Sequence, residues 1–174
     1  MDQHDQKVLK ERARLLAQQK VDSSHAADKL SVVTFELIPE KYAIEDMFVR
    51  QVFTLTDLTP VPGTPSFIMG VTNHRGGIIS IVNLKELFGI KDRGLTEMNK
   101  VLILSYNDME FGVVADSVTG SRQISYEDVK ALPATSHSRG SNFIKGMLSD
   151  GYILLNAAEL MSSEVMLIKQ STHS

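Results

Sequence analysis

The chain contains no cysteine among its 174 residues. Without thiols it can form neither a disulfide framework nor a thiolate metal site, which suits a reducing compartment. It also lacks a run of about eighteen apolar residues, the length that a membrane-spanning helix needs. Its first residues are charged and have no apolar signal-peptide segment. We therefore expect a cytoplasmic protein with no direct membrane insertion.

Tryptophan is absent as well, aromatic residues make up only 6% of the chain, and the net charge is -3. Proteins that bind single-stranded nucleic acid need aromatic stacking platforms and a basic groove. Nucleic acid is therefore disfavoured as a partner. Hydrophobic residues at 43% and charged residues at 22% are typical of a globular protein.

The usual catalytic and metal-binding patterns are missing too. The sequence contains no HExxH, phosphate-binding loop, GxGxxG or GxSxG motif. Ser136 and His137 are adjacent, but neighbouring side chains on a loop rarely make a nucleophile and base pair. The histidines are dispersed along the chain, at His4, His25, His74, His137 and His173. We expect a protein that is not an enzyme and that has no catalytic residues, no cofactor and no metal.

Residues 1–30 differ in composition from the rest of the chain. The segment VLKERARLLAQQ contains strong helix formers, and its Val and Leu residues return to one face, which predicts an amphipathic helix. Asp22 to Lys29 reads as a polar linker. A helix packed on its own domain or frayed at the terminus is preferred over a dedicated partner-binding helix, and both stay open. Residues 166–174 are interpreted as a C-terminal tail.

From Ser31 onward the pattern changes to strands rich in Val, Ile, Phe and Leu, divided by Gly, Pro, Asn and Asp. The fold class is therefore mainly β. Most connections are too short for a crossover between parallel strands, so we expect antiparallel sheets. Only NLKELFG and NAAELMSS look like short helices, each placed after a strand.

The second half of this β region repeats the first. Five segments recur in the same order at offsets of 69 to 76 residues: 33–37 with 102–106, 42–44 with 111–113, 57–62 with 128–133, 67–70 with 143–146, and 83–87 with 156–160. Two related β units of about seventy residues each would bury little surface alone. We expect them to share a hydrophobic interface, as two lobes with a groove between them.

The first unit carries a longer hairpin than the second. From Gly70 to Asn83 is thirteen residues, against ten from Gly146 to Asn156. The extra residues surround the turn Asn-His-Arg-Gly-Gly at positions 73–77, where Gly76, Gly77 and Asn73 can adopt a positive φ. Arg75 at this turn is either merely solvated or a recognition residue held by a rigid β scaffold. The pattern alone leaves both interpretations open.

These segments resemble the CheW-like domain family, which includes the chemotaxis coupling protein CheW and the regulatory domain of the chemotaxis histidine kinase CheA. The resemblance covers residues 31–165, and its most specific element is the Gly-Val-Thr-Asn-x-Arg-Gly run that begins at Gly70. It implies two intertwined SH3-like five-stranded β-barrel lobes, roughly 31–98 and 99–165, around a shared hydrophobic core. Phe67, Ile68, Phe143 and Ile144 are assigned to that core.

The resemblance also implies a function. A chain of 174 residues has no room for the kinase's other domains, so we expect a non-catalytic adaptor of bacterial chemotaxis. It would couple CheA, through the kinase's regulatory domain, to the signalling tip of a methyl-accepting chemoreceptor, and so lie peripheral to receptor arrays. The alternative, from a different class, is a small β-barrel module that binds a ligand or an oligonucleotide.

The implied binding residues belong to two groups. Receptor binding is assigned to residues at or near the groove and the hairpin: Arg75, Asn73, His74, Gly70 and Val49. Kinase binding is assigned to a strand edge in the first lobe: Gln51, Val52 and Phe53. For Val49 and Val52, core packing is an equally good interpretation, because alternate residues of a strand face inward.

Two positions depart from the family pattern. His74 stands where an aliphatic residue is common, which puts a titratable ring beside Arg75. A solvated loop histidine is preferred there over a pH-dependent role. Asn83 stands where an Asp is common, and it keeps the helix-capping acceptor while losing the charge.

Overall fold

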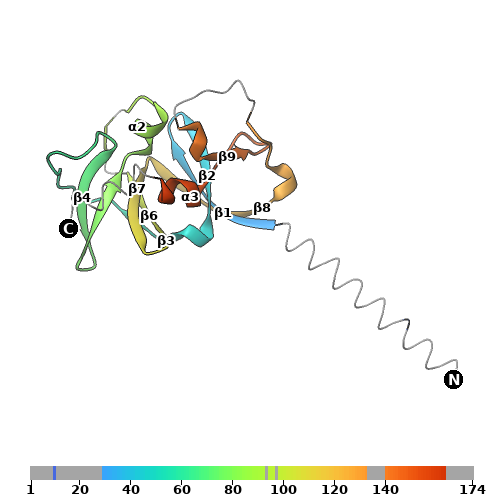
Figure 1. The fold of residues 1–174 in the computed structure, drawn as a ribbon, viewed down its shortest axis with the longest axis horizontal. Coiled ribbons are helices and arrows are strands. Elements are labelled where there is room, and N and C mark those ends of the chain that lie inside the picture. The colour runs from blue at the N-terminus through green and yellow to red at the C-terminus, as the bar shows by residue number, and fades with distance from the viewer. Residues whose placement is uncertain (1–9, 11–28, 93, 97, 133–139, 164–174) are drawn as a thin grey trace.

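The computed structural model describes Lys10 and residues 29–163, with gaps at 93, 97 and 133–139. The helix predicted within residues 1–30 and the tail at 166–174 lie almost wholly outside these residues. The β region begins at Lys29 rather than Ser31, because Lys29 and Leu30 already pair with Ser125 and Ile124. Figure 1 shows two lobes side by side.

Each lobe is built on one five-stranded sheet. Sheet A has the order β8 (Ser117–Ser125), β1 (Lys29–Leu37), β2 (Glu40–Glu45), β10 (Ile153–Leu155) and β9 (Ile144–Met147). Sheet B has the order β3 (Val49–Thr54), β6 (Lys100–Tyr106), β7 (Met109–Ala115), β5 (Gly77–Val82) and β4 (Ile68–His74). The helical elements are short: η1 (Asp46–Phe48), α2 (Leu84–Phe88), η2 (Tyr126–Asp128), η3 (Ser141–Phe143) and α3 (Ala157–Ser162). The predicted mainly β class with two SH3-like lobes is confirmed.

The two sheets are not the two sequential halves of the chain. Strands β1 and β2 from the first half join β8, β9 and β10 from the second, while β6 and β7 join β3, β4 and β5. A division at residues 98 and 99 therefore separates the repeated units but not the lobes. The physical reason is that each unit places its first hairpin in one sheet and its remaining strands in the other. This exchange ties the lobes together through the chain itself.

The same exchange corrects the expectation of purely antiparallel sheets. Strand β10 pairs with β2 in parallel, and β5 pairs with β7 in parallel. In both cases the partners come from different repeated units, so no short crossover has to join them. The other pairings are antiparallel. The parallel pairs are the places where one unit is stitched into the other.

Equivalent backbone bridges close the two lobes. In sheet B, Thr59 and Val71 exchange two hydrogen bonds of 2.8 Å, which joins the segment after β3 to β4. In sheet A, Lys130 and Met147 exchange bonds of 2.9 and 2.8 Å, which joins the segment after β8 to β9. The bridging residues are 71 (130 minus 59) and 76 (147 minus 71) positions apart, two of the offsets of the sequence repeat. The repeat is therefore confirmed as a structural one.

Three hydrophobic clusters fill the described part of the molecule. One lies inside each lobe, around Val32 and Leu154 in sheet A and around Ile81 and Val101 in sheet B. The largest joins residues of both sheets and of helices α2 and α3. Phe67, Ile68 and Phe143 belong to it and Ile144 packs against it, so the four predicted core positions are confirmed.

An aromatic column crosses this shared core. Tyr42 stacks on Phe35 of its own sheet at 5.9 Å between ring centroids, and on Phe88 of α2 at 5.5 Å. Burial raises the pKa of Tyr42 far above its usual value, and the hydrogen bond that its hydroxyl donates to Glu40 adds to the shift. The ring is therefore neutral and holds α2 against sheet A.

Two features of the strands are not marked by the hydrophobic pattern. Strand β8 continues to Ser125 through a polar and mostly exposed stretch that contains Gly120. The apolar segment 42–55 is divided by η1 into β2 and β3. The pattern fails at both places because one is an exposed edge strand and the other is the passage of the chain between sheets.

Candidate partner-binding surfaces

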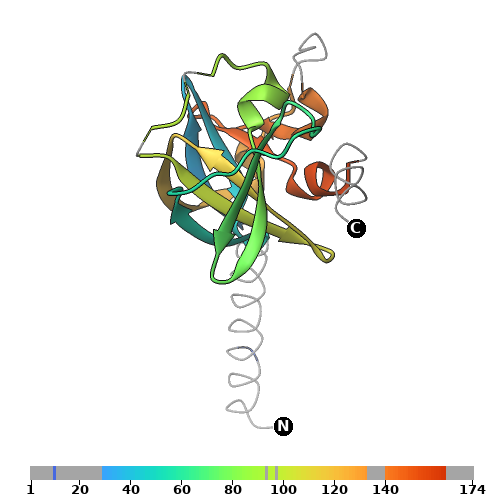
Figure 2. The ribbon, with the colours of Figure 1, turned by 90° about the vertical axis from the view of Figure 1, so that its left-hand side faces the viewer.

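The β4–β5 hairpin projects beyond the rest of its lobe (Figures 1 and 2). His74 pairs with Gly77, so the turn itself consists of two residues, Arg75 and Gly76, with φ of 52° and 81°. Two positive φ values define a type I′ turn, whose twist suits a hairpin. Of the three residues that could adopt a positive φ, only Gly76 does so, because Gly77 and Asn73 lie in the strands. Arg75 itself is held in the left-handed region, which is uncommon for a residue with a side chain.

The outer face of this hairpin carries Asn73 and Ile78, which lie opposite each other. Asn73 accepts a hydrogen bond of 3.2 Å from the backbone of Gly76, so it supports the turn that holds Arg75. Ile78 is 77% exposed, the highest value among the large hydrophobic residues of the described chain. Ile78 is not among the binding residues predicted from the sequence. The signal was present, since adjacent Ile78 and Ile79 on one strand cannot both face inward.

Close packing of the backbone requires a glycine at position 70. A Cβ atom at this position would lie 2.3 Å from the backbone oxygen of Thr59. With φ at 151°, the residue also adopts a backbone conformation that side chains disfavour. Gly70 is buried and lets the segment after β3 approach β4 closely. Its direct role is therefore in closing the lobe.

Strand β3 is the edge of sheet B and pairs only with β6 in the described structure. Its side chains alternate, with Val49, Gln51 and Phe53 turned partly inward and Val52 exposed at 38%. Val49 packs against the shared core and Phe53 against the interior of the lobe. Of the three residues assigned to kinase binding, Val52 is thus the one whose side chain is exposed. Gln51 and Phe53 contribute to the proposed kinase-binding edge mainly through their backbone groups.

His74 lies at the inner side of the hairpin. Its ring stacks on Phe53, with centroids 4.2 Å apart and planes inclined by 14°. The stack joins β4 to β3, the two edge strands of the same sheet. The structure thus brings together a residue assigned to receptor binding and one assigned to kinase binding. The preferred interpretation of His74 as a solvated loop residue is wrong, because the ring packs and its Nε2 is buried.

Asn83 caps α2 as predicted, accepting a hydrogen bond of 3.1 Å from the backbone of Lys85. Its amide also donates to Asp92 at 2.7 Å. An aspartate at position 83 would place two carboxylates at this distance, so the departure from the family pattern suits its neighbour.

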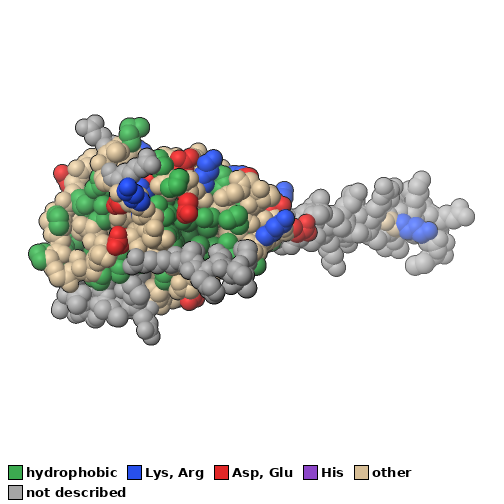
Figure 3. All heavy atoms as spheres, turned by 90° about the horizontal axis from the view of Figure 1, so that it is seen from above, with side chains coloured by type: hydrophobic (Ala, Val, Ile, Leu, Met, Phe, Trp, Pro, Cys, Tyr) green, Lys and Arg blue, Asp and Glu red, His purple; other side chains and the backbone are tan. Residues whose placement is uncertain are grey.

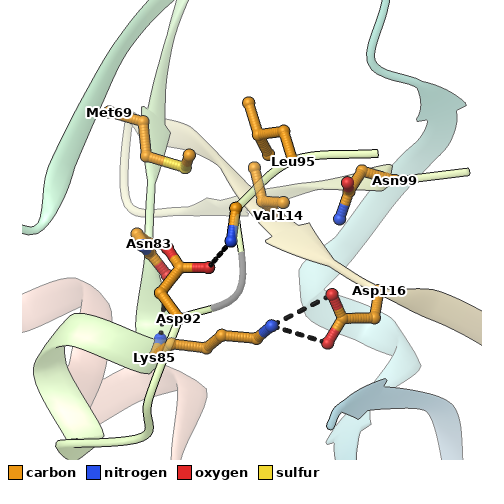
Figure 4. Close-up of a pocket in the computed structure, with 9 residues that line it drawn as sticks. Met69, Asn83, Lys85, Asp92, Leu95, Asn99, Val114 and Asp116 are labelled. Carbon is orange, nitrogen blue, oxygen red and sulfur yellow. Dashed lines mark hydrogen bonds and ion pairs between the residues drawn. The ribbon is translucent and has the colours of Figure 1, made fainter. Parts of the chain in front are cut away.

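Beside this cap, Lys85 reaches back to Asp116 (Figure 4), with Nζ 3.0 and 2.8 Å from the two carboxylate oxygens. Asp116 also accepts a hydrogen bond from the backbone of Ile38 in the β1–β2 turn. The same residue donates its backbone N–H to Glu36 of β1. The pair therefore links α2 to both sheets. The cavity between these side chains measures about 10 Å³, the room of a single water molecule.

Charges of both signs are mixed on the face seen in Figure 3, among hydrophobic side chains. Among the described residues, no three His, Asp or Glu side chains come together as a metal site would require. In that same part of the chain, no helix has the length and apolar character to cross a membrane.

Comparisons with known proteins match the same two lobes. A family model described as the CheW-like domain matches residues 31–165. The chain is 30% identical over 144 residues to the chemotaxis protein CheW of Treponema pallidum, covering 79% of this chain and 85% of that protein. It is 32% identical over 131 residues to the chemotaxis protein CheW of Thermotoga maritima, covering 75% and 85%. The solved structure of the scaffolding protein TtCheW from Thermoanaerobacter tengcongensis aligns with a TM-score of 0.69 and 27% identity, covering 78% of this chain and 94% of that one.

Proposed function

The chain belongs to the CheW-like domain family, and from this premise we propose that it is a non-catalytic adaptor of bacterial chemotaxis. It holds the histidine kinase CheA, through the kinase's regulatory domain, against the signalling tip of a methyl-accepting chemoreceptor. It is cytoplasmic and peripheral to receptor arrays through protein contacts. This role requires two surfaces that can be occupied at once.

The observation that carries the proposal is the β4–β5 hairpin. Only one lobe has this extended hairpin. It exposes the charged side chain of Arg75 and the apolar side chain of Ile78 to solvent. A guanidinium on a two-residue turn is suited to acceptors at the surface of a helical hairpin. Strand β3, with Val52 exposed at a sheet edge, supports a second and separate surface for the kinase domain.

The alternative class, a β-barrel that binds a ligand or an oligonucleotide, has less support. The interior of each lobe is filled by its own cluster of hydrophobic side chains. The charges on the face in Figure 3 are mixed, whereas an oligonucleotide needs a basic groove. Salt-dependent retention on immobilised single-stranded DNA would favour this alternative.

The experiment measures binding of the Arg75→Ala variant to two partners separately, a receptor signalling-tip fragment and the kinase regulatory domain. Receptor affinity should fall by about 1–3 kcal/mol, because an acceptor on the receptor loses its partner. Kinase affinity and thermal unfolding should stay nearly unchanged. Arg122→Ala is the matched control, since Arg122 is an exposed arginine on β8 of the other lobe. Equal losses for both partners would mean that the receptor surface is assigned wrongly.

A second measurement tests the adaptor role itself. Added to purified kinase and receptor, the protein should raise autophosphorylation of the kinase without being consumed. Turnover of a small substrate by the isolated chain would contradict a non-catalytic role.

A further inference from the structure

The pairing of the strands does not explain why His74 stacks on Phe53. Strands β3 and β4 are the two ends of the hydrogen-bonded order of sheet B, so no ladder of backbone bonds runs between them. The backbone bridge between Thr59 and Val71 joins the segment after β3 to the middle of β4. His74 is the last residue of β4, next to the turn. The ring contact with Phe53 is thus a second closure of the lobe, placed at the base of the projecting turn.

The imidazole makes this contact as a flat ring rather than as a hydrogen-bonding group. Its Nε2 is buried and has no hydrogen-bond partner among the described residues. The planes are inclined by only 14° at a centroid distance of 4.2 Å, which is close contact over the ring faces. Aromatic pairs of this kind contribute beyond the apolar area that they bury. The imidazole of His74 therefore acts as a packing group.

Its neighbour in the chain is Arg75, which needs support. A non-glycine residue with φ of 52° is held in a disfavoured region, and such conformations persist when the surroundings over-determine them. On one side, Asn73 binds the backbone of Gly76. On the other side, His74 anchors the end of β4 to β3. Together these two contacts hold the chain on both sides of Arg75.

We propose that His74 and Phe53 are positioning residues, whose stack holds the β4–β5 hairpin against β3 and so presents Arg75 to the receptor helix. This inference rests on the proposed function for its partner, but not for the mechanics of the hairpin. It also assigns Phe53 an inward role, so that the kinase meets β3 through its edge backbone and Val52. A receptor helix with acceptors near an apolar side chain is the partner that such a hairpin fits.

The test compares His74→Ala with His74→Phe in the full chain. Binding of the receptor signalling-tip fragment to His74→Ala should weaken roughly 2- to 10-fold, the range that corresponds to losing one aromatic stack. His74→Phe keeps a flat ring and should restore wild-type affinity. Binding of the kinase regulatory domain should be the same for all three proteins. Wild-type affinity in His74→Ala, or a loss in His74→Phe equal to that in His74→Ala, would overturn the proposal.

Phe53→Ala supplies the other half of a double-mutant cycle. If the two rings act through each other, the variant that combines His74→Ala with Phe53→Ala should lose no more receptor affinity than the single variant with the larger loss. Losses that multiply would mean that the residues act independently, and would overturn the proposal.

Hydrogen exchange in the unbound protein separates this inference from the function on which it rests. The backbone amides of residues 74–78 should exchange faster in His74→Ala than in the wild type, and at the wild-type rate in His74→Phe. If the wild type fails to bind a receptor fragment, the proposed function is wrong while the exchange rates still decide the role of the stack. Unchanged exchange in His74→Ala would overturn the positioning role.

Discussion

The two hairpins that complete the lobes occupy equivalent places and differ in length. Strands β4 and β5 have seven and six residues, whereas β9 and β10 have four and three. The first strand of each hairpin carries a closing bridge, and both hairpins lead into a short helix whose N-cap is an asparagine, Asn83 or Asn156. The common parts serve the scaffold. The extra residues of the β4–β5 hairpin include Arg75 and Ile78, and we expect recognition there.

The helices that follow the hairpins differ in a second way. Lys85 of α2 and Ala158 of α3 are equivalent, 73 positions apart (158 minus 85), the offset of the two capping asparagines. Lys85 is buried and paired with Asp116, whereas Ala158 packs against the shared core. At this position, one helix is therefore held by an ion pair and the other by apolar contact, although both helices also pack other side chains into the shared core. Substitutions at these sites show how far the two lobes are interchangeable.

The largest effect is expected from Lys85→Met, which places an apolar side chain in α2 where α3 has Ala158. Removing the ammonium leaves the carboxylate of Asp116, only 17% exposed, without its cation. Breaking a buried pair from one side costs about 3–5 kcal/mol of the free energy of unfolding. Urea denaturation measures the loss. Adding Asp116→Asn should recover much of it, because the amide oxygen can still accept from Ile38 while no charge is left buried. A double variant as unstable as the single one would contradict this account.

A smaller loss is expected from alanine at the two glycines beside the closing bridges. At Gly146, a Cβ atom would lie 2.6 Å from the backbone oxygen of Lys130, and this crowding should cost about 1–3 kcal/mol. At Gly70 the approach is closer and the φ of 151° adds strain, so the loss should be the greater, about 3 kcal/mol. Gly77→Ala is the control, since its nearest neighbour would be 3.6 Å away. Thermal unfolding of the three variants checks the order, and a Gly70 variant more stable than the Gly146 variant would contradict it.

Much of this architecture could be predicted from the sequence, because the period of apolar residues reports which stretches are strands and the repeat reports that two units exist. The exchange of strands between sheets could not. A strand's partner depends on contacts between residues far apart in the chain, and β2 beside β10 leaves no local mark. The stack of His74 on Phe53 was missed for the same reason, since it exists only once the edge strands of sheet B curl toward each other. The conformation of Arg75 was missed because the two glycines that follow it were the better candidates for a positive φ.

The exposed apolar residues of the two hairpins give a comparison in binding. Ile78→Ser should lower receptor affinity by about 1 kcal/mol or more, the scale of an interface contact that matters, without lowering stability. Met147, 40% exposed on β9 of the other lobe, is the matched site. Met147→Ser should leave receptor affinity unchanged. Calorimetric titration of both variants with the signalling-tip fragment makes the measurement, and equal losses would mean that the short hairpin also meets the receptor.

The smallest effect concerns two turns of the same kind. The β6–β7 hairpin turns at Asn107 and Asp108, with φ of 46° and 65°, between the paired residues Tyr106 and Met109. This is again a type I′ turn, and asparagine is favoured at its first position because it tolerates the left-handed region. In the β4–β5 turn that position is Arg75, so the protein holds a less suitable residue there.

Exchanging the residues between these turns should therefore have opposite consequences for stability. Arg75→Asn should raise the free energy of unfolding by about 0.5–1 kcal/mol, and Asn107→Arg should lower it by a similar amount, since both differences reflect the cost of a left-handed backbone. Receptor affinity should fall in Arg75→Asn and stay unchanged in Asn107→Arg. Denaturant unfolding and receptor titration of the two variants measure these quantities. A loss of stability in Arg75→Asn would mean that the arginine side chain holds its own turn, and that it stands there for folding rather than for recognition.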